Sequence, residues 1–123
     1  VRQIVDLDNE NNDINKIMNI YINNYKLAKS NIHGTGVYAN TFIPKNNIIG
    51  IAMTFKFIFY PHITDDLGKW INHSYKPNSF IYYYPLENVY FLIANQDIPE
   101  NTEITMNYRN TPWYIKKPEL HYK

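Results

Sequence analysis

The first 24 residues carry apolar side chains at helical rather than strand spacing. Asp is a residue type that caps helices, so a helix could begin near Asp13. The apolar residues that follow it have the i, i+3, i+4, i+7, i+8 spacing, which would place all of them on one face of that helix. These residues are Ile14, Ile17, Met18, Tyr21 and Ile22. We predict that residues 1–24 form a helical extension whose helix, over residues 13–23, packs its apolar face on the core. A helix that binds a partner is the alternative.

From Tyr25 onward the pattern changes to short apolar segments bounded by Gly, Pro, Asn and Asp. Such segments, separated by polar turns, predict β-strands. The predicted strands cover residues 25–29, 37–42, 48–53, 55–60, 79–84, 89–95 and 102–107. Residues 85–88 would turn a hairpin, residues 31–36 would form another turn, and residues 61–68 would form a loop with one helical turn at its end. The chain is therefore predicted to be mostly β, as one domain over residues 25–123.

Composition narrows the possible functions. The 123 residues are 45% hydrophobic, enough for one core, yet no apolar run is long enough for a membrane span. The absence of cysteine excludes disulfides and thiolate zinc sites, and the four histidines lack metal-ligand spacing, so no metal site is predicted. A net charge of +1 gives no electrostatic signal for nucleic-acid binding.

The segment Asn72-His73-Ser74 follows Trp70-Ile71 and precedes a turn at Pro77-Asn78. Polar side chains at this density do not fit a plain strand, because each buried one would need a hydrogen-bond partner. A surface turn that contains a satisfied histidine is one interpretation. A functional site is the other, and the segments on either side favour it.

Two further segments accompany this one along the chain. The first is His33-Gly34-Thr35-Gly36-Val37-Tyr38-Ala39. The second is Ala94-Asn95-Gln96-Asp97-Ile98-Pro99-Glu100, which leads to Glu103-Ile104-Thr105-Met106-Asn107-Tyr108. In this order, from about Tyr25 to Trp113, the three segments resemble the SET-domain lysine methyltransferases. The resemblance is greatest to the minimal viral SET proteins, whose ending is similar to residues 113–120.

The resemblance implies a fold and an activity. The fold would be a SET-domain β-clip of small curved sheets, in which the segment at Asn72 meets the segment ending at Tyr108 in a pseudoknot-like crossing. The activity would be methyl transfer from S-adenosylmethionine to a lysine of a protein or peptide, such as a histone tail. Neither a membrane nor a nucleic-acid partner is implied.

The resemblance also implies a set of cofactor-binding residues. Gly34 and Gly36 would let the backbone wrap the methionine end of S-adenosylmethionine, and the Asn72 amide would contact its amino-acid tail. The backbone of His73 and the ring of Trp113 would contact adenine, although Trp113 could instead anchor the tail of the chain on the core. The full set is His33, Gly34, Gly36, Tyr38, Asn72, His73 and Trp113.

Tyr108 would be the catalytic residue, with its hydroxyl at the methyl-transfer channel. An ordinary buried tyrosine that bonds to the backbone is the alternative, because the chain has twelve tyrosines. Residues 51–71 form a shorter insert than is usual in the family. One wall of the substrate groove would then come from residues 1–24 or from a second subunit in a homodimer.

Two other functions stay open at this point. The first is a catalytically weak or inactive SET-like module that binds a peptide or cofactor, which the short insert suggests. The second is an aromatic-rich β domain that stacks on nucleic acid, although the near-neutral charge disfavours it.

Overall fold

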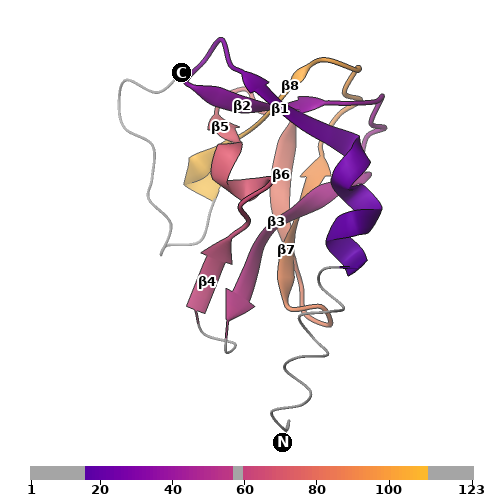
Figure 1. The fold of residues 1–123 in the computed structure, drawn as a ribbon, viewed down its shortest axis with the longest axis vertical. Coiled ribbons are helices and arrows are strands. Elements are labelled where there is room, and N and C mark those ends of the chain that lie inside the picture. Colours follow the sequence, from indigo (N-terminus) through magenta and orange to yellow (C-terminus); the bar gives the residue numbers. More distant parts are fainter. Residues whose placement is uncertain (1–15, 57–59, 111–123) are drawn as a thin grey trace, which may run out of the picture.

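The structure, a computed structural model, describes residues 16–56 and 60–110. A short helix at residues 16–21 precedes eight strands in two sheets (Figure 1). The strands are β1 (Tyr25–Lys29), β2 (Thr35–Ala39), β3 (Ile48–Lys56), β4 (Tyr60–Ile63), β5 (Asn72–His73), β6 (Ser79–Tyr84), β7 (Val89–Ala94) and β8 (Glu103–Met106). Three 3-10 turns complete the list: η1 (Ile22–Asn24), η2 (Gly68–Trp70) and η3 (Tyr108–Asn110). The prediction of a mostly β chain with an N-terminal helix is confirmed.

Each sheet has four strands. The first has the order β1-β2-β8-β5 and the second the order β4-β3-β7-β6. All pairs are antiparallel except β5 with β8, which are parallel. The predicted hairpin is present, because β6 and β7 pair in continuous register from Ser79↔Ala94 to Tyr84↔Val89. Asn88 ends its turn with a φ of 54°, a value that Asn tolerates better than most residues.

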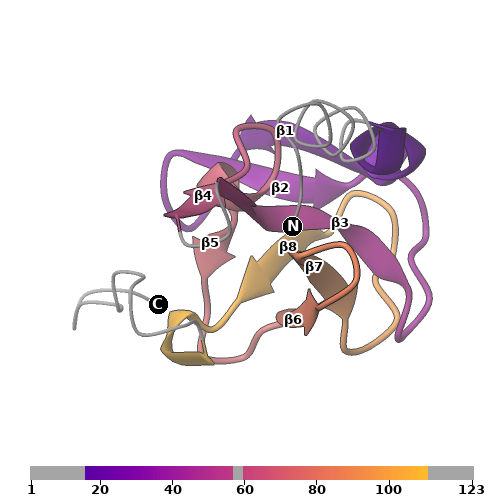
Figure 2. The same ribbon diagram turned by 90° about the horizontal axis from the view of Figure 1, so that it is seen from below.

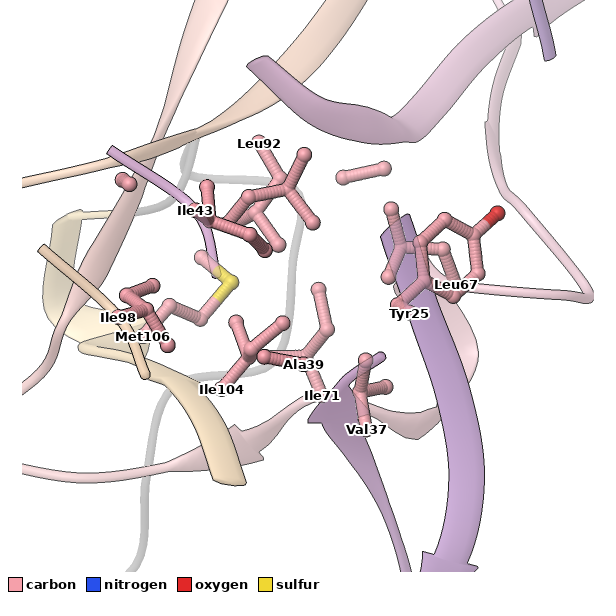
Figure 3. Packing of buried hydrophobic residues seen from close by; sticks show 13 residues of the cluster. Tyr25, Val37, Ala39, Ile43, Leu67, Ile71, Leu92, Ile98, Ile104 and Met106 are labelled. Atoms are coloured by element: carbon pink, nitrogen blue, oxygen red, sulfur yellow. The ribbon is translucent and has the colours of Figure 1, made fainter. Parts of the chain in front are cut away.

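The main core lies between the two sheets (Figure 3). β1, β2 and β8 contribute side chains from the first sheet, β3 and β7 contribute from the second, and three connecting segments contribute the rest. The ten labelled residues are Tyr25, Val37, Ala39, Ile43, Leu67, Ile71, Leu92, Ile98, Ile104 and Met106. Two of these connecting segments meet at an isolated bridge between Ile43 and Ile98.

The helix covers the outer face of the second sheet. Ile17, Met18 and Tyr21 pack against a second apolar cluster, formed by Ile51, Val89, Phe91 and Ile93. The predicted packing of this helix on the core is thus observed for its described part, while Asp13 and Ile14 lie outside the described residues. Ile22 falls in η1 instead and is 48% exposed. Within the described ranges, no helix is long and apolar enough to span a bilayer.

Several predicted boundaries between residues 39 and 70 are wrong. The strand predicted to end at residue 42 ends at Ala39, where the Asn40 N–H donates to Asn24 O. The first two strands of the second sheet also differ: β3 is continuous through Lys56, and β4 occupies part of the expected loop. Pro61 is compatible with β4 because β4 is an edge strand, so one side of it needs no backbone donors. The helical turn comes later than predicted, at η2.

The polar segment around Asn72 does contain a strand, contrary to our expectation. Asn72 and His73 pair with Thr105 and Met106 of β8, and the Ser74 N–H donates to Met106 O at 2.9 Å. Beyond Ser74, the hydrogen bonds to the β8 backbone come from side chains. Asn78 Nδ2 donates to Glu103 O at 2.9 Å, and Asn78 Oδ1 accepts from the Thr105 N–H at 2.9 Å. The Asn78 amide therefore continues the ladder where β5 has ended, and the predicted meeting of the two segments is confirmed.

Replacing Asn78 with Ala should destabilise the fold. Asn78 is buried, at 8% exposure, and its loss removes the partners of two backbone groups in β8. We expect a loss of about 1–3 kcal/mol in the free energy of unfolding, measured by urea denaturation. Gln96→Ala removes an exposed amide from a turn and should change the free energy by less than about 0.5 kcal/mol. Equal effects of the two substitutions would contradict this role for Asn78.

Candidate functional site

The Asn72 side chain joins β5 to the loop that precedes β2. Its Nδ2 group donates to Ser30 Oγ at 3.0 Å, to His33 O at 3.0 Å and to Glu103 Oε2 at 2.9 Å. These acceptors come from three separate parts of the chain. Asn72 is 8% exposed, so the amide needs such partners in order to be buried without a large cost in free energy.

Glu103 of β8 is the second centre of this network. Its carboxylate accepts from Ser30 Oγ at 2.9 and 2.8 Å, besides the bond from Asn72. The Tyr38 hydroxyl donates to Lys29 O at 2.9 Å and lies 3.5 Å from Glu103 Oε1. Desolvation and the negative charge of Glu103 raise the pKa of Tyr38, so this phenol keeps its proton and acts as a donor.

Ser30 shapes the loop of residues 31–34. Its Oγ accepts from the N–H groups of Ile32 at 2.8 Å and His33 at 3.3 Å, while its own N–H donates to Gly34 O at 2.7 Å. Gly34 has a φ of +47°, which a residue with a side chain rarely adopts. One serine therefore holds both the turn and the carboxylate of Glu103.

The two glycines of the motif serve different purposes. A Cβ at Gly34 would meet no atom within 4 Å, so this position needs glycine for its φ alone. A Cβ at Gly36 would overlap Glu103 Oε2 and approach Ser30 Cβ to 3.0 Å. Gly36 is buried in β2 and leaves the space that the Glu103 carboxylate occupies. We expected both glycines to free the backbone for a ligand, and the structure gives Gly36 a packing role.

His73 points toward η3. Its Nδ1 accepts from the Tyr108 N–H at 3.0 Å, and its ring meets the rings of Tyr108 and Tyr75 edge-on, with centroids 5.1 and 4.3 Å away. Arg109 lies over the Tyr75 ring at 5.2 Å. Burial and then the positive charge of Arg109 lower the pKa of His73, in agreement with an acceptor role that requires an unprotonated Nδ1.

The Tyr108 hydroxyl donates to Ile71 O at 2.5 Å. Ile71 immediately precedes Asn72 and is 2% exposed, and the Tyr108 ring packs on the main core. The phenol has one proton, which this bond uses, so its oxygen offers only lone pairs to any other group. Tyr108 is thus tied to the backbone, as in the simpler interpretation, yet it can still accept a bond from an incoming N–H group.

The structure brings most of the predicted site residues to the β5–β8 pair and the loop beside it. His33, Gly36 and Tyr38 lie around the Asn72–Glu103 network, Gly34 closes its loop, and His73 contacts Tyr108. Trp113 lies outside the described residues. Three residues of this site were not predicted from the sequence: Ser30, Glu103 and Tyr75. Glu103 was part of a quoted motif, and a carboxylate beside a predicted site was the signal to follow.

The two glycines should respond differently to substitution. At Gly34, Asn should cost less than Ala, because Asn tolerates the left-handed region; we expect about 1 kcal/mol for Ala. At Gly36, Asn should cost more than Ala, because the larger side chain displaces Glu103 further. Urea denaturation of the four variants gives the two orders. The same order at both positions would contradict the assignment.

The stability of the fold should depend on the protonation of His73. Because the pKa of His73 is lowered on folding, its contribution is complete above about pH 6.5, the unfolded value, and is lost as the pH falls through the lower folded value. His73→Asn keeps an acceptor near the Tyr108 N–H and removes the titration, so the fall in melting temperature below pH 6.5 should become shallower. The exposed-site control is His33→Asn. An unchanged pH profile in His73→Asn would be the contrary result.

Comparisons with known proteins agree with this fold. Residues 52–109, just under half of the chain, match the SET domain family model. Among 124 matching chains of solved structures, a Plasmodium falciparum protein described as a candidate histone methyltransferase is 25% identical, with a TM-score of 0.58 over 75% of this chain and 97% of that chain.

A second match comes from a structure on the product specificity of histone lysine methyltransferases. It is 17% identical with a TM-score of 0.51, over 70% of this chain and 50% of that chain, and bears on the fold alone. The comparison with curated proteins found no match. The chain therefore carries a SET-domain match over residues 52–109, and its described residues have the mostly β fold of SET-domain methyltransferase structures.

Proposed function

We propose that this protein is a lysine methyltransferase that uses S-adenosylmethionine. The observation that carries the proposal is the pairing of β5 with β8 inside a SET-domain fold. That pairing sets the Asn72 amide against the loop of residues 31–34 and sets Tyr108 against His73. These are the segments that the resemblance assigns to cofactor binding and to catalysis.

The residues fit such a cofactor by their chemistry. The open space at Gly34 leaves the loop free to approach a ligand. The two protons of the Asn72 NH₂ group are shared among three acceptors beside it, which fixes the amide. The rings of Tyr75 and Tyr108 suit a ligand that carries positive charge. We propose His33, Gly34, Gly36, Tyr38, Asn72, His73 and Trp113 as the residues that hold S-adenosylmethionine.

When bound, S-adenosylmethionine supplies a methyl carbon on a positively charged sulfur: the lysine nitrogen forms the new N–C bond, the C–S pair stays on sulfur, and the amine releases one proton. A lysine of pKa ~10.4 is neutral about once in 2,500 molecules at pH 7, a cost of roughly 4.6 kcal/mol. A desolvated aromatic channel lowers that pKa. The lone pairs of the Tyr108 hydroxyl then accept an N–H bond and orient the nitrogen.

The substrate is proposed to be a lysine of a protein tail, with a histone tail as the first candidate. The match to the Plasmodium falciparum protein, which is described as a candidate histone methyltransferase, supports this choice.

One wall of the substrate groove needs a source other than the short insert at residues 51–71. The helix at residues 16–21 lies across the molecule from η3 in both views (Figures 1 and 2) and packs on the outer face of the second sheet. Residues 16–21 are thus not the proposed source of the wall, and residues 1–15 lie outside the described residues. We propose a second subunit in a homodimer as the source.

The activity is tested by incubating the protein with methyl-labelled S-adenosylmethionine and purified histones, followed by mass spectrometry of the products. Label on lysine supports the proposal. Cofactor binding in calorimetry without label on histones or on a lysine-rich lysate would favour the catalytically inactive module. No binding at all would overturn the proposal.

Replacing Tyr108 with Phe should lower the rate more than the stability. The ring stays, but the lysine loses its orienting oxygen, and we expect methyl transfer to fall by on the order of 10²-fold or more. The Ile71 carbonyl also loses its donor, at a cost of about 1–2 kcal/mol in unfolding free energy. Rates are therefore compared per folded molecule, well below the melting temperature.

Tyr83→Phe is the matched control for this substitution. Its hydroxyl donates to Asn88 Oδ1 at 2.6 Å on an exposed part of the second sheet, so its removal should leave the rate unchanged. A Tyr108→Phe rate equal to that of Tyr83→Phe would show that Tyr108 is a structural tyrosine.

A further inference from the structure

We propose that Glu103 is a positioning residue that fixes which end of the Asn72 carboxamide faces the cofactor. Glu103 directs the NH₂ group of Asn72 into the protein and leaves Oδ1 for the ligand. The site would then recognise the ammonium group of the amino-acid tail through Asn72, and not its carboxylate. This inference rests on the proposed use of S-adenosylmethionine.

An asparagine amide has a donor end and an acceptor end of nearly equal shape, so its neighbours decide its orientation. Around Asn72 every such neighbour accepts. The backbone oxygen of His33 and the carboxylate of Glu103 have no proton to give. The single proton of the Ser30 hydroxyl is directed to Glu103, so its oxygen also accepts from Asn72. A flipped amide would set Oδ1 against three oxygens.

Glu103 is the member of this set that imposes the orientation. Its charge makes the reversed amide repulsive, and it also captures the Ser30 proton that could otherwise serve Asn72 Oδ1. The chain holds the carboxylate there by several means. β8 pairs Glu103 with Tyr38 of β2, the Tyr38 hydroxyl lies 3.5 Å from Oε1, and Gly36 provides the space.

The orientation has a chemical consequence for the ligand. With its NH₂ group directed inward, Asn72 can offer a ligand only the carbonyl oxygen. A carbonyl oxygen bonds an ammonium group and repels a carboxylate. The orientation of the Asn72 amide determines recognition of the ammonium group only. A change at Glu103 should therefore alter specificity for the amino group without altering contacts to the rest of the ligand.

The test compares two ligands in calorimetry: S-adenosylhomocysteine, and its analogue with hydrogen in place of the α-amino group. Glu103→Gln keeps the shape of the side chain, but its amide can donate to Asn72 Oδ1 and stabilise the flipped form. We expect about tenfold or greater loss of affinity for S-adenosylhomocysteine and an unchanged affinity for the analogue. Glu87→Gln, which removes the same charge from an exposed turn, should change neither.

A double-mutant cycle separates orientation from simple charge attraction. If Glu103 acts through Asn72, then Glu103→Gln should cause no further loss of affinity in a protein that already carries Asn72→Ala. If the negative charge attracts the ligand directly, the loss should persist in that background. Persistence would overturn the inference.

A measurement on the wild type keeps the proposal testable if Glu103→Gln does not fold. S-adenosylhomocysteine should shift the ¹³Cγ resonance of Asn72 while its carboxamide protons stay protected from exchange, and the analogue should not. Carboxamide protons that turn to the ligand would overturn the inference, as would an equal loss for both ligands in Glu103→Gln. A wild type that binds neither ligand would instead overturn the proposed function.

Discussion

The parallel contact between β5 and β8 is the constraint on which the site depends. It involves only Asn72 and His73 of β5, yet it fixes both of their side chains. Because successive strand residues point to opposite faces, Asn72 reaches the loop before β2 while His73 reaches Tyr108. A shift of one residue in this register would exchange the two side chains and separate both contacts at once.

Because β5 is so short, side chains supply further hydrogen bonds to β8, and the residues that supply them follow β5 closely in the sequence. Asn78 continues the ladder on β8, and the Ser79 hydroxyl donates to Thr105 O at 2.6 Å. These polar groups are buried, and burial is tolerable because each has a partner. The dense polar segment therefore serves the crossing itself, which explains why a stretch with the composition of a surface turn lies inside the fold.

Much of the architecture was accessible from the pattern of the sequence. Alternation and turn residues located β1, the β6–β7 hairpin and the apolar face of the helix, because these features depend on neighbouring residues. The site required the order of three motifs, which indicates that distant segments meet but not how. The roles of Glu103 and Gly36 could not be predicted, since a missing Cβ and a carboxylate from another strand define one space only after the chain has folded.

The local sequence pattern predicted strand boundaries wrongly where tertiary contacts determine them. β4 forms in a segment with Pro61 because an edge strand tolerates proline, and sequence alone did not show that this strand lies at an edge. β2 ends early because Ala39 and Asn40 bond to Asn101 and Asn24, residues that are remote in sequence. In each case the strand boundary depends on which distant parts of the chain are neighbours, and the local pattern does not contain that information.

The place of β8 in the sheet has a consequence for how the molecule assembles. Among the described strands β8 comes last in the chain, and both of its neighbours in the first sheet, β2 and β5, are synthesised well before it. Until β8 inserts between them, β2 and β5 have no strand in common, and closing these long loops is the slow entropic step expected of non-local pairing. The hydrogen-bond network around Asn72 then forms only at that late step, so ligand binding during refolding would report completion of the sheet rather than its start.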